Sequence, residues 1–370
     1  MSLVKKSGDA ILQVVATNMH LSQKHGMTIN EIINDGFSID FRVDSALDDD
    51  SPLGTVKSIS KTMEGMGKAL ENLSPDIVVI LGDRYEMLAT ASAAAILNIP
   101  IAHIHGGEIT EGAYDDSLRH AITKLSTLHF ASTDEYARRI VQMGEEPNRV
   151  YNVGAPGVEN TLRSEILSLR ELEKSIGFSL GDKYFVVTFH PVTKQPGSEK
   201  KQTSELIATL NKYIHQGWKF LVTMPNSDTH GSMVASMLSE WAFEYPQNVC
   251  LVKSLGRKRF FSALKHSHGI IGNSSSGIIE APSFGIPTVN IGDRQKGRVK
   301  GPTVIDVSPD ADFIYKAIEK AISPETKEKI SLLDISSLNP YYKPDTAENI
   351  VTHLLYDNLP PVKRFYDVKE

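Results

Sequence analysis

Short apolar runs alternate along this chain with longer segments of helical periodicity. In the first half the runs are ILQVVATN, DIVVILG, PIAHIHGG, LHFAST and VYNVG, and in the second half YFVVTFH, KFLVTMP, NVCLVKS, HGIIGNS, PTVNIG and TVIDV. Near-continuous apolar runs of this length are typical of strands buried on both faces of a parallel sheet. Segments such as SELIATLNKYIHQG and DEYARRIVQMG lie between them and predict amphipathic helices. The repeated strand–helix order predicts an α/β chain with right-handed crossovers.

A polar, helical connection, NTLRSEILSLRELEKSIGFSLGDK, precedes the second set of strands. We therefore expect two Rossmann-type domains facing a cleft, residues 1–165 and 166–345, with a C-terminal helix and tail, 346–370, packed near their boundary. Many predicted strands end in polar or glycine-rich turns. Because ligands of open α/β sheets bind at the carboxyl ends of strands, we expect the functional site in these turns.

Composition excludes several classes of protein. The 370 residues include 41% apolar and 23% charged residues and carry a net charge of −6, so we expect no nucleic-acid partner. No apolar run reaches the ~20 residues that span a bilayer, and MSLVKKSGDA lacks a secretory apolar region. We expect a cytoplasmic protein with no membrane partner. The lone cysteine, Cys250, sits in VCLV and is expected to be a small core residue.

The sequence GNSSSG, residues 272–277, follows one apolar run and precedes a predicted helix. Free backbone N–H groups at such a turn, with the hydroxyls of Ser274 and Ser275 and the close approach that Gly277 permits, suit a diphosphate. The carboxylate of Glu280 can accept hydrogen bonds from both ribose hydroxyls. The alternative is that the serines only cap the helix.

A second motif, GDRYE, follows the strand DIVVIL. Asp83 is placed to act as a general acid or base, and Arg84 to contact a phosphate. Alternatively, Asp83 caps the following helix and Arg84 is solvated.

The third motif, HIHGGE, brings His103 and His105 to alternate positions of a strand, which places them on one face. This spacing raises the possibility of a metal site, but no convincing further ligands accompany it, so no metal is expected. The nearby pair Asp115 and Asp116 can serve proton transfer, or can cap the helix that follows.

Two further turns belong to the second half. His190 ends a strand in TFHP and can donate to a phosphate or assist a leaving group, although a histidine before proline is often only a turn residue. Asn226 ends the next strand in MPNSD. The basic loop GDRQKGR, residues 292–298, can screen a phosphate or be a solvated turn.

The motifs GDRYE, HIHGGE with a following DD and RHAITK, FHP, GNSSSGIIEAP and GDRQKGR occur here in the order of one family. From about Ile11 to its end, the chain resembles the hydrolysing UDP-N-acetylglucosamine 2-epimerases of sialic acid synthesis, the NeuC-like group. The resemblance implies a GT-B-like fold, a UDP-sugar substrate, no cofactor, and a homo-oligomer, either a dimer or a tetramer. It implies hydrolysis of UDP-N-acetylglucosamine to N-acetylmannosamine and UDP: a base removes the C2 proton as UDP leaves C1, and the resulting glycal is hydrated.

The resemblance also assigns residues to proton transfer. Asp83 matches an acid/base group of the family. Asp115 matches a second carboxylate, although the neighbouring Asp116 could be the matching residue instead. Some family members carry a glutamate at the position of His105. Here the nearest carboxylate is Glu108, so either His105 takes the proton role or Glu108 reaches in, and we favour His105 slightly.

The nucleotide is assigned to turns that follow predicted strands. The residues that match are His190 near the diphosphate, Ser274 and Ser275 at the phosphates, Glu280 at the ribose and, with less support, Arg84 and Asn226.

The start of the chain departs from the family pattern, because MSLVKKSGD resembles the end of the first helix and ILQVVATN the second strand. The first strand and its basic GTR-type loop are expected to be missing. That strand is central in the sheet of the family, so its loss exposes the edges of both neighbours.

Three alternatives remain open from the sequence. The same chemistry can act on a UDP- or GDP-2,4-diacetamido-2,4,6-trideoxyhexose of legionaminic acid synthesis. The chain can be a GT-B glycosyltransferase, although the proton-transfer groups argue against it, or a nucleotide-sugar binder without activity.

Overall fold

A computed structural model of the chain describes residues 1–23, 26–45, 49, 51–111, 113–192, 197–225, 231–360 and 362–368. The chain divides into two compact units. Unit 1 comprises Met1–Ile109, Tyr114–Glu159 and Tyr341–Glu370, and unit 2 comprises Thr110–Ala113 and Asn160–Pro340. The division thus falls a few residues before the boundary that we placed at residue 165, and the C-terminal segment joins unit 1 from Tyr341 onward.

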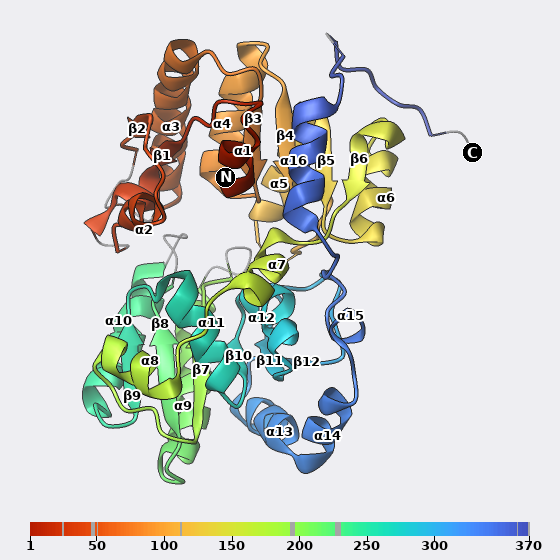
Figure 1. Cartoon of the computed structure of the whole chain (residues 1–370). Helices are drawn as coiled ribbons and strands as arrows, with labels where there is room; N and C mark the ends of the chain where they lie inside the picture. The colour runs from red at the N-terminus through yellow and green to blue at the C-terminus, as the bar shows by residue number, and fades with distance from the viewer. Residues whose placement is uncertain are drawn as a thin grey trace. The chain divides into compact units, whose positions relative to one another are not determined.

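Unit 1 alternates short strands with helices (Figure 1). Its elements are α1 (Ser2–Ser7), β1 (Val15–Thr17), η1 (Asn18–Leu21), α2 (Ile29–Asn34), β2 (Phe41–Val43), α3 (Pro52–Leu73), β3 (Val78–Leu81), α4 (Tyr85–Ile96), β4 (Ile101–Ile104), α5 (Asp115–Leu125), β5 (Leu128–Ala131), α6 (Asp134–Gln142), η3 (Pro147–Arg149), β6 (Val150–Asn152) and α16 (Thr346–Tyr356). The division between the units falls inside α7 (Pro156–Arg163). The sequence reading missed β2, a strand of only three residues.

The strands of unit 1 form two separate parallel sheets, β1-β2 and β3-β4-β5-β6. Figure 1 shows β1 and β2 beside α3, apart from β3 to β6. In β3, which is an edge strand, the side chains of Val79 and Leu81 are 48% and 57% exposed. The outer edge of β3 is therefore unpaired among the described strands, and two of its apolar side chains are exposed. A single core nevertheless joins the two sheets, since Val43 of β2 and Ile80 of β3 both belong to the cluster packed around α3 and α4.

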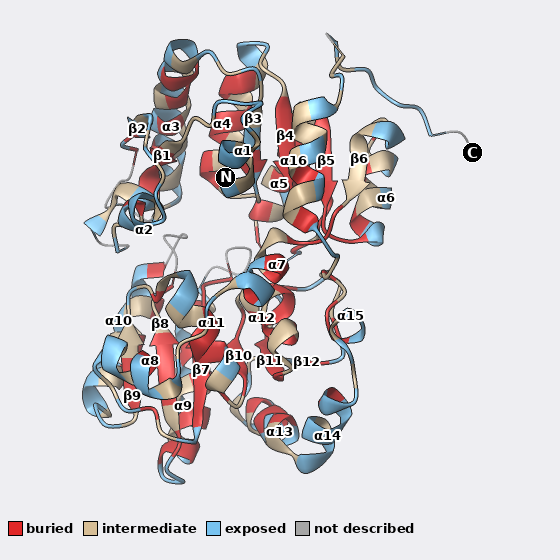
Figure 2. Cartoon of the chain, in the orientation of Figure 1, coloured by how far each residue is buried: buried red, intermediate tan, exposed pale blue. Residues whose placement is uncertain are grey.

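Unit 2 contains one six-stranded parallel sheet with helices on both faces. Its elements are α8 (Leu169–Ile176), β7 (Tyr184–Thr188), α9 (Glu199–Ile214), β8 (Lys219–Thr223), α10 (Gly231–Glu244), β9 (Val249–Val252), α11 (Gly256–His266), β10 (Ile270–Gly272), α12 (Ser276–Ile279), η4 (Ala281–Phe284), β11 (Thr288–Ile291), β12 (Val304–Val307), α13 (Ala311–Ile322), α14 (Pro324–Ser331) and α15 (Ile335–Leu338). As Figure 2 shows, β7 and β11 are buried along their whole length, as the apolar runs predicted.

Alternate residues of β7 enter different cores. Phe185 and Val187 pack with α9, α10 and α13, whereas Tyr184 and Val186 pack with α8 and α11. Successive strand side chains point to opposite faces, so a strand covered on both faces must be apolar throughout. The strand order is β12-β11-β10-β7-β8-β9, so the chain reverses its direction of progress between β7 and β10. Ligands of open α/β sheets bind at such a switch point.

Neither unit has a helix with the length and hydropathy needed to cross a bilayer, among the residues that the structure describes.

Two buried histidines lie side by side in unit 1, since His103 of β4 is the register partner of His129 of β5. The Nε2 atom of His103 lies 2.8 Å from the carbonyl oxygen of Gly82, which can only accept, so Nε2 carries the proton. Burial lowers the pKa of His103 to about 3, and burial likewise lowers the pKa of His129, despite the nearby carboxylate of Glu145. Both rings are therefore neutral at physiological pH.

Glu145 anchors the C-terminal segment of unit 1. Its carboxylate accepts hydrogen bonds from Nε2 of His129 at 2.9 Å, from Nζ of Lys124 at 2.6 Å and from Nζ of Lys363 at 2.7 Å. Burial alone would raise the pKa of Glu145, but these donors outweigh it and the pKa is lowered. The ring of Phe365 lies against Nζ of Lys124, 4.7 Å from the ring centre.

We expect the buried histidines to make the protein sensitive to mild acid. An unfolded histidine binds its proton near pH 6.5, whereas His103 and His129 resist protonation when folded. Stability is therefore retained above pH 6.5 and falls below it, by about 1.4 kcal/mol per pH unit for His103, and His129 acts in the same direction. Unfolding free energies measured between pH 7.5 and 5 should show a shallower pH dependence for His103→Gln than for the wild type. The exposed His215→Gln is the matched control, and an equal pH dependence in all three proteins would contradict the prediction.

Candidate functional site

Asp83 follows β3 in a turn that needs a glycine, because Gly82 has φ +83°. Helix α4 has Arg84 at its N-cap and no side-chain capping bond, so Asp83 does not cap it. The Oδ2 atom of Asp83 instead accepts a hydrogen bond from the guanidinium of Arg119. The carboxylate is about a quarter exposed, so it remains accessible to a ligand while its orientation is fixed.

Arg119 of α5 joins the ends of two strands. Its side chain is only 1% exposed, and besides Asp83 it contacts the backbone carbonyl of Glu108 at 2.9 Å and Oδ1 of Asp116 at 3.6 Å. A buried charge is stable only when it is paired and hydrogen-bonded. The motif RHAITK contains Arg119, but nothing in the sequence indicated this function.

The turn after β4 corrects one expectation. Strand β4 ends at Ile104, and His105 has φ +69°, so the alternation that would place both histidines on one face does not extend to His105. His103 points inward to Gly82 and to the hydroxyl of Thr123, 3.2 Å from Nδ1. The described residues contain no cluster of three or more metal-ligating side chains.

His105 and Glu108 contact each other across this turn. Nδ1 of His105 lies 2.6 Å from Oε1 of Glu108, and the same oxygen accepts a hydrogen bond from the hydroxyl of Ser132 at 2.7 Å. The structure thus brings together His105, Glu108 and, through Arg119, Asp83.

The two aspartates at the start of α5 do not cap it, because its N-cap is Tyr114 and no side-chain capping bond is present. Asp115 is buried. Asp116 contacts Arg119, and its Oδ2 lies 3.9 Å from Nε2 of His120. Burial lowers the pKa of His120, against the effect of Asp116.

Arg84 is held by a network that the sequence reading missed. Its Nε lies 3.3 Å from Oε2 of Glu86, a buried carboxylate. The side-chain amide of Asn18 donates to Glu86 and to the hydroxyl of Tyr85, the latter at 2.7 Å. Asn18 follows β1 with φ +47°, a conformation that asparagine tolerates better than most residues. That positive φ could not be read from the sequence.

In unit 2, the GNSSSG turn lies at the switch point between β7 and β10. Gly272 has φ +141°, and a Cβ there would lie 2.0 Å from the carbonyl oxygen of Thr188, so only glycine fits. The side chain of Asn273 accepts from the backbone N–H of His190 at 2.7 Å and donates to its carbonyl at 2.8 Å. One amide therefore joins the carboxyl ends of both central strands.

The serine part of the turn leaves donors available. Within the described residues, the backbone N–H groups of Ser274 and Ser275 have no acceptor. The helix that follows has only four residues, so its dipole contributes little. Gly277 is buried, and Glu280 is half-buried after the end of this helix.

The basic loop, residues 292–298, forms hydrogen bonds with the GNSSSG turn. Arg294 and Gln295 donate to the backbone carbonyl of Asn273 at 3.3 and 2.9 Å. The loop is thus part of the turn's framework. Asn226 lies outside the described residues.

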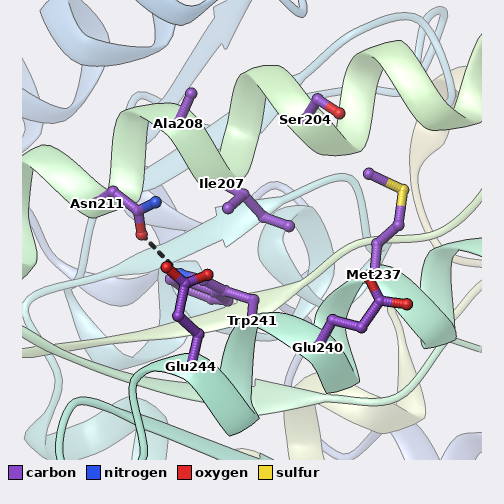
Figure 3. A pocket seen from close by; sticks show the side chains of 8 residues that line it. All are labelled: Ser204, Ile207, Ala208, Asn211, Met237, Glu240, Trp241 and Glu244. Atoms are coloured by element: carbon purple, nitrogen blue, oxygen red, sulfur yellow. Dashed lines mark hydrogen bonds between the residues drawn. The ribbon is translucent and has the colours of Figure 1, made fainter.

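A separate pocket of about 300 Å³ lies between α9 and α10 (Figure 3). Nε1 of Trp241 donates to Oδ1 of Asn211 at 2.7 Å in its wall. None of the residues assigned above lines this pocket.

Comparison with known proteins first defines the class. The chain resembles the crystal structure of the Methanocaldococcus jannaschii UDP-GlcNAc 2-epimerase in complex with UDP-GlcNAc and UDP, with a TM-score of 0.77 and 17% identity, over 96% of this chain and 95% of that one. The fold is therefore of the GT-B-like α/β class that we expected, with parallel sheets in two units.

Sequence comparison then gives the family. A profile of the UDP-N-acetylglucosamine 2-epimerase family matches residues 3–355, and the chain belongs to this family. It is 37% identical to the polysialic acid biosynthesis protein P7 of Escherichia coli, over 100% of this chain and 93% of that protein. It is also 37% identical to the GDP/UDP-N,N'-diacetylbacillosamine 2-epimerase (hydrolyzing) of Campylobacter jejuni, over 88% of this chain and 83% of that protein.

We expect Asn273→Ala to destabilise unit 2. The substitution leaves the buried N–H and carbonyl groups of His190 without their partners, which should lower the free energy of unfolding by about 2–4 kcal/mol. Denaturant unfolding measures this loss, with the exposed Asn148→Ala as the matched control. A loss within 0.5 kcal/mol of the control would show that the amide clamp does not hold the two strand ends together.

Proposed function

We propose that this protein is a hydrolysing 2-epimerase that converts UDP-N-acetylglucosamine to N-acetylmannosamine and UDP. The observation that carries the proposal is the buried Arg119, which gathers Asp83, Asp116 and the HGGE turn at the strand ends of unit 1. Inversion at C2 requires a proton to leave that carbon and to return from the other face. Groups that accept and donate protons must therefore stand at fixed positions.

The proposed reaction has two steps. A base in unit 1 removes the C2 proton, the electrons form a C1=C2 double bond, and the C1–O bond breaks as UDP leaves. Water then adds its hydroxyl to C1 and a proton reaches C2 from the opposite face. In this proposal Asp83 and the HGGE turn each supply one proton-transfer group, with Asp115 or Asp116 as a further carboxylate.

We assign the UDP moiety to unit 2. The unpaired N–H groups of Ser274 and Ser275 suit the diphosphate, and the glycine-lined switch point suits a nucleotide. Glu280 is the proposed ribose ligand. His190 is the proposed donor to the departing diphosphate, and Arg84 of unit 1 a further cation.

The name of one relative supports an alternative substrate. The Campylobacter jejuni protein is named for a diacetylbacillosamine nucleotide, so the same chemistry on a UDP- or GDP-2,4-diacetamido-2,4,6-trideoxyhexose is the alternative.

Incubation with UDP-N-acetylglucosamine in deuterated water tests the function. We expect free UDP and N-acetylmannosamine that carries deuterium at C2, because the returning proton comes from solvent. UDP release only from the trideoxy sugar nucleotide would favour the alternative substrate. A requirement for an acceptor sugar would indicate a glycosyltransferase, and binding without UDP release would contradict an enzymatic function.

Two substitutions should separate chemistry from binding. Asp83→Asn should slow turnover by about 100-fold or more and leave the UDP dissociation constant nearly unchanged. Glu280→Ala should weaken UDP binding, because it removes the ribose acceptor. Turnover gives the first effect and titration calorimetry with UDP the second. Near-wild-type turnover would remove Asp83 from the mechanism, and an unchanged UDP affinity would remove Glu280 from the ribose site.

A further inference from the structure

The carboxylate of Glu108 is directed at the ring of His105 and is closed off from solvent. Oε1 of Glu108 lies 2.6 Å from Nδ1 of His105, and the exposed fraction is 2% for the glutamate side chain but 13% for the histidine. A proton-transfer group must come within hydrogen-bond distance of its substrate. Of the two side chains, the ring is the one that solvent, and hence a ligand, can reach.

We infer that Glu108 is a positioning residue, which fixes the tautomer of His105 so that Nε2 is the atom that exchanges the sugar C2 proton; this inference rests on the proposed function. Oε1 of Glu108 accepts a hydrogen bond from Ser132 at 2.7 Å. An ionised carboxylate only accepts, so Nδ1 of His105 carries the proton toward it. Nε2 is left with its lone pair, and no described residue forms a hydrogen bond with it.

The backbone holds this pair in place. The N–H group of His105 donates to the carbonyl of Phe130 at 3.0 Å, although φ at His105 is +69°. Such a conformation is disfavoured for a non-glycine residue and persists only where its surroundings impose it. A Cβ at Gly107 would lie 2.5 Å from the carbonyl of Tyr136, and the carbonyl of Gly107 accepts from Arg139 at 2.6 Å. Gly107 therefore packs closely against α6, which carries both Tyr136 and Arg139.

The chemical step balances with this assignment. Nε2 takes the proton from C2, the C–H electrons form the C1=C2 bond, and the C1–O electrons leave with UDP. The ring becomes an imidazolium, which the adjacent carboxylate of Glu108 stabilises. A group on the opposite face gives its proton to C2, water gives its hydroxyl to C1, and the remaining proton of the water restores that group. His105 returns its proton to solvent.

The test compares Glu108→Gln, His105→Gln and the double variant of the full-length chain, with the exposed Glu71→Gln as control. Steady-state release of UDP from UDP-N-acetylglucosamine gives kcat and KM. Circular dichroism and UDP titration establish that each variant is folded and binds nucleotide. Nitrogen-15 spectra of labelled histidine, assigned with His105→Gln, report which ring nitrogen carries the proton.

We expect each single substitution to lower kcat by about 100-fold with KM nearly unchanged. The double variant should be about as slow as the slower single variant, because the two residues act as one unit. The wild type should show the Nδ1–H ring, and Glu108→Gln should shift the population toward Nε2–H. Glu108→Asp, which keeps the charge, should recover part of the lost kcat.

A loss of kcat of about 10⁴-fold in the double variant, the product of the two single losses, would overturn the inference, because His105 and Glu108 would then act independently. An unchanged tautomer in Glu108→Gln would also overturn it. If the wild type releases no UDP, the proposed function fails, whereas the tautomer measurement still decides whether Glu108 positions His105.

Discussion

The buried guanidinium of Arg119 is the constraint on which the arrangement of unit 1 depends. Its charge is costly to remove from water, and an unpaired buried charge would destabilise the fold by several kcal/mol. The carboxylate of Asp83, the carbonyl of Glu108 and the carboxylate of Asp116 supply the necessary partners. Asp83 follows β3 and Glu108 follows β4, whereas Asp116 belongs to α5 itself, so pairing the charge also fixes two loops relative to α5.

In unit 2 an uncharged side chain holds the ends of two strands together. The side-chain amide of Asn273 joins its own turn to the backbone of His190, and Gly272 lets the two strand ends approach to a distance that no other residue permits. With this neutral clamp in place, the N–H groups of Ser274 and Ser275 have no acceptor among the described residues. In the proposed function these backbone donors would meet the diphosphate.

The sequence was most informative where the structure is repetitive. Apolar runs predicted eleven strand positions. The agreement is best explained for β4, β5, β7, β10 and β11, which are buried at every residue, because a strand covered on both faces must be apolar throughout. It failed where a tertiary contact decides the conformation. The periodicity of HIHGGE extends the strand through His105, but the pairing of His105 with Phe130 and Glu108 imposes a positive φ there. Asp83 has the local features of a helix cap, and only the position of Arg119 on another helix makes it an ion pair.

The two sheets of unit 1 are linked at their carboxyl ends by the side chain of Asn18. With no strand pairing between β1 and β3, the two sheets are joined through the core around α3 and α4 and, at their carboxyl ends, through Asn18. Its amide donates to Tyr85 and Glu86 at the start of α4. Glu86 in turn orients Arg84, so the position of a proposed phosphate ligand depends on a residue of the smaller sheet. The positive φ of Asn18 persists because two buried acceptors impose it. Side-chain hydrogen bonds thus provide at this edge the alignment that backbone pairing provides between β7 and β10 of unit 2.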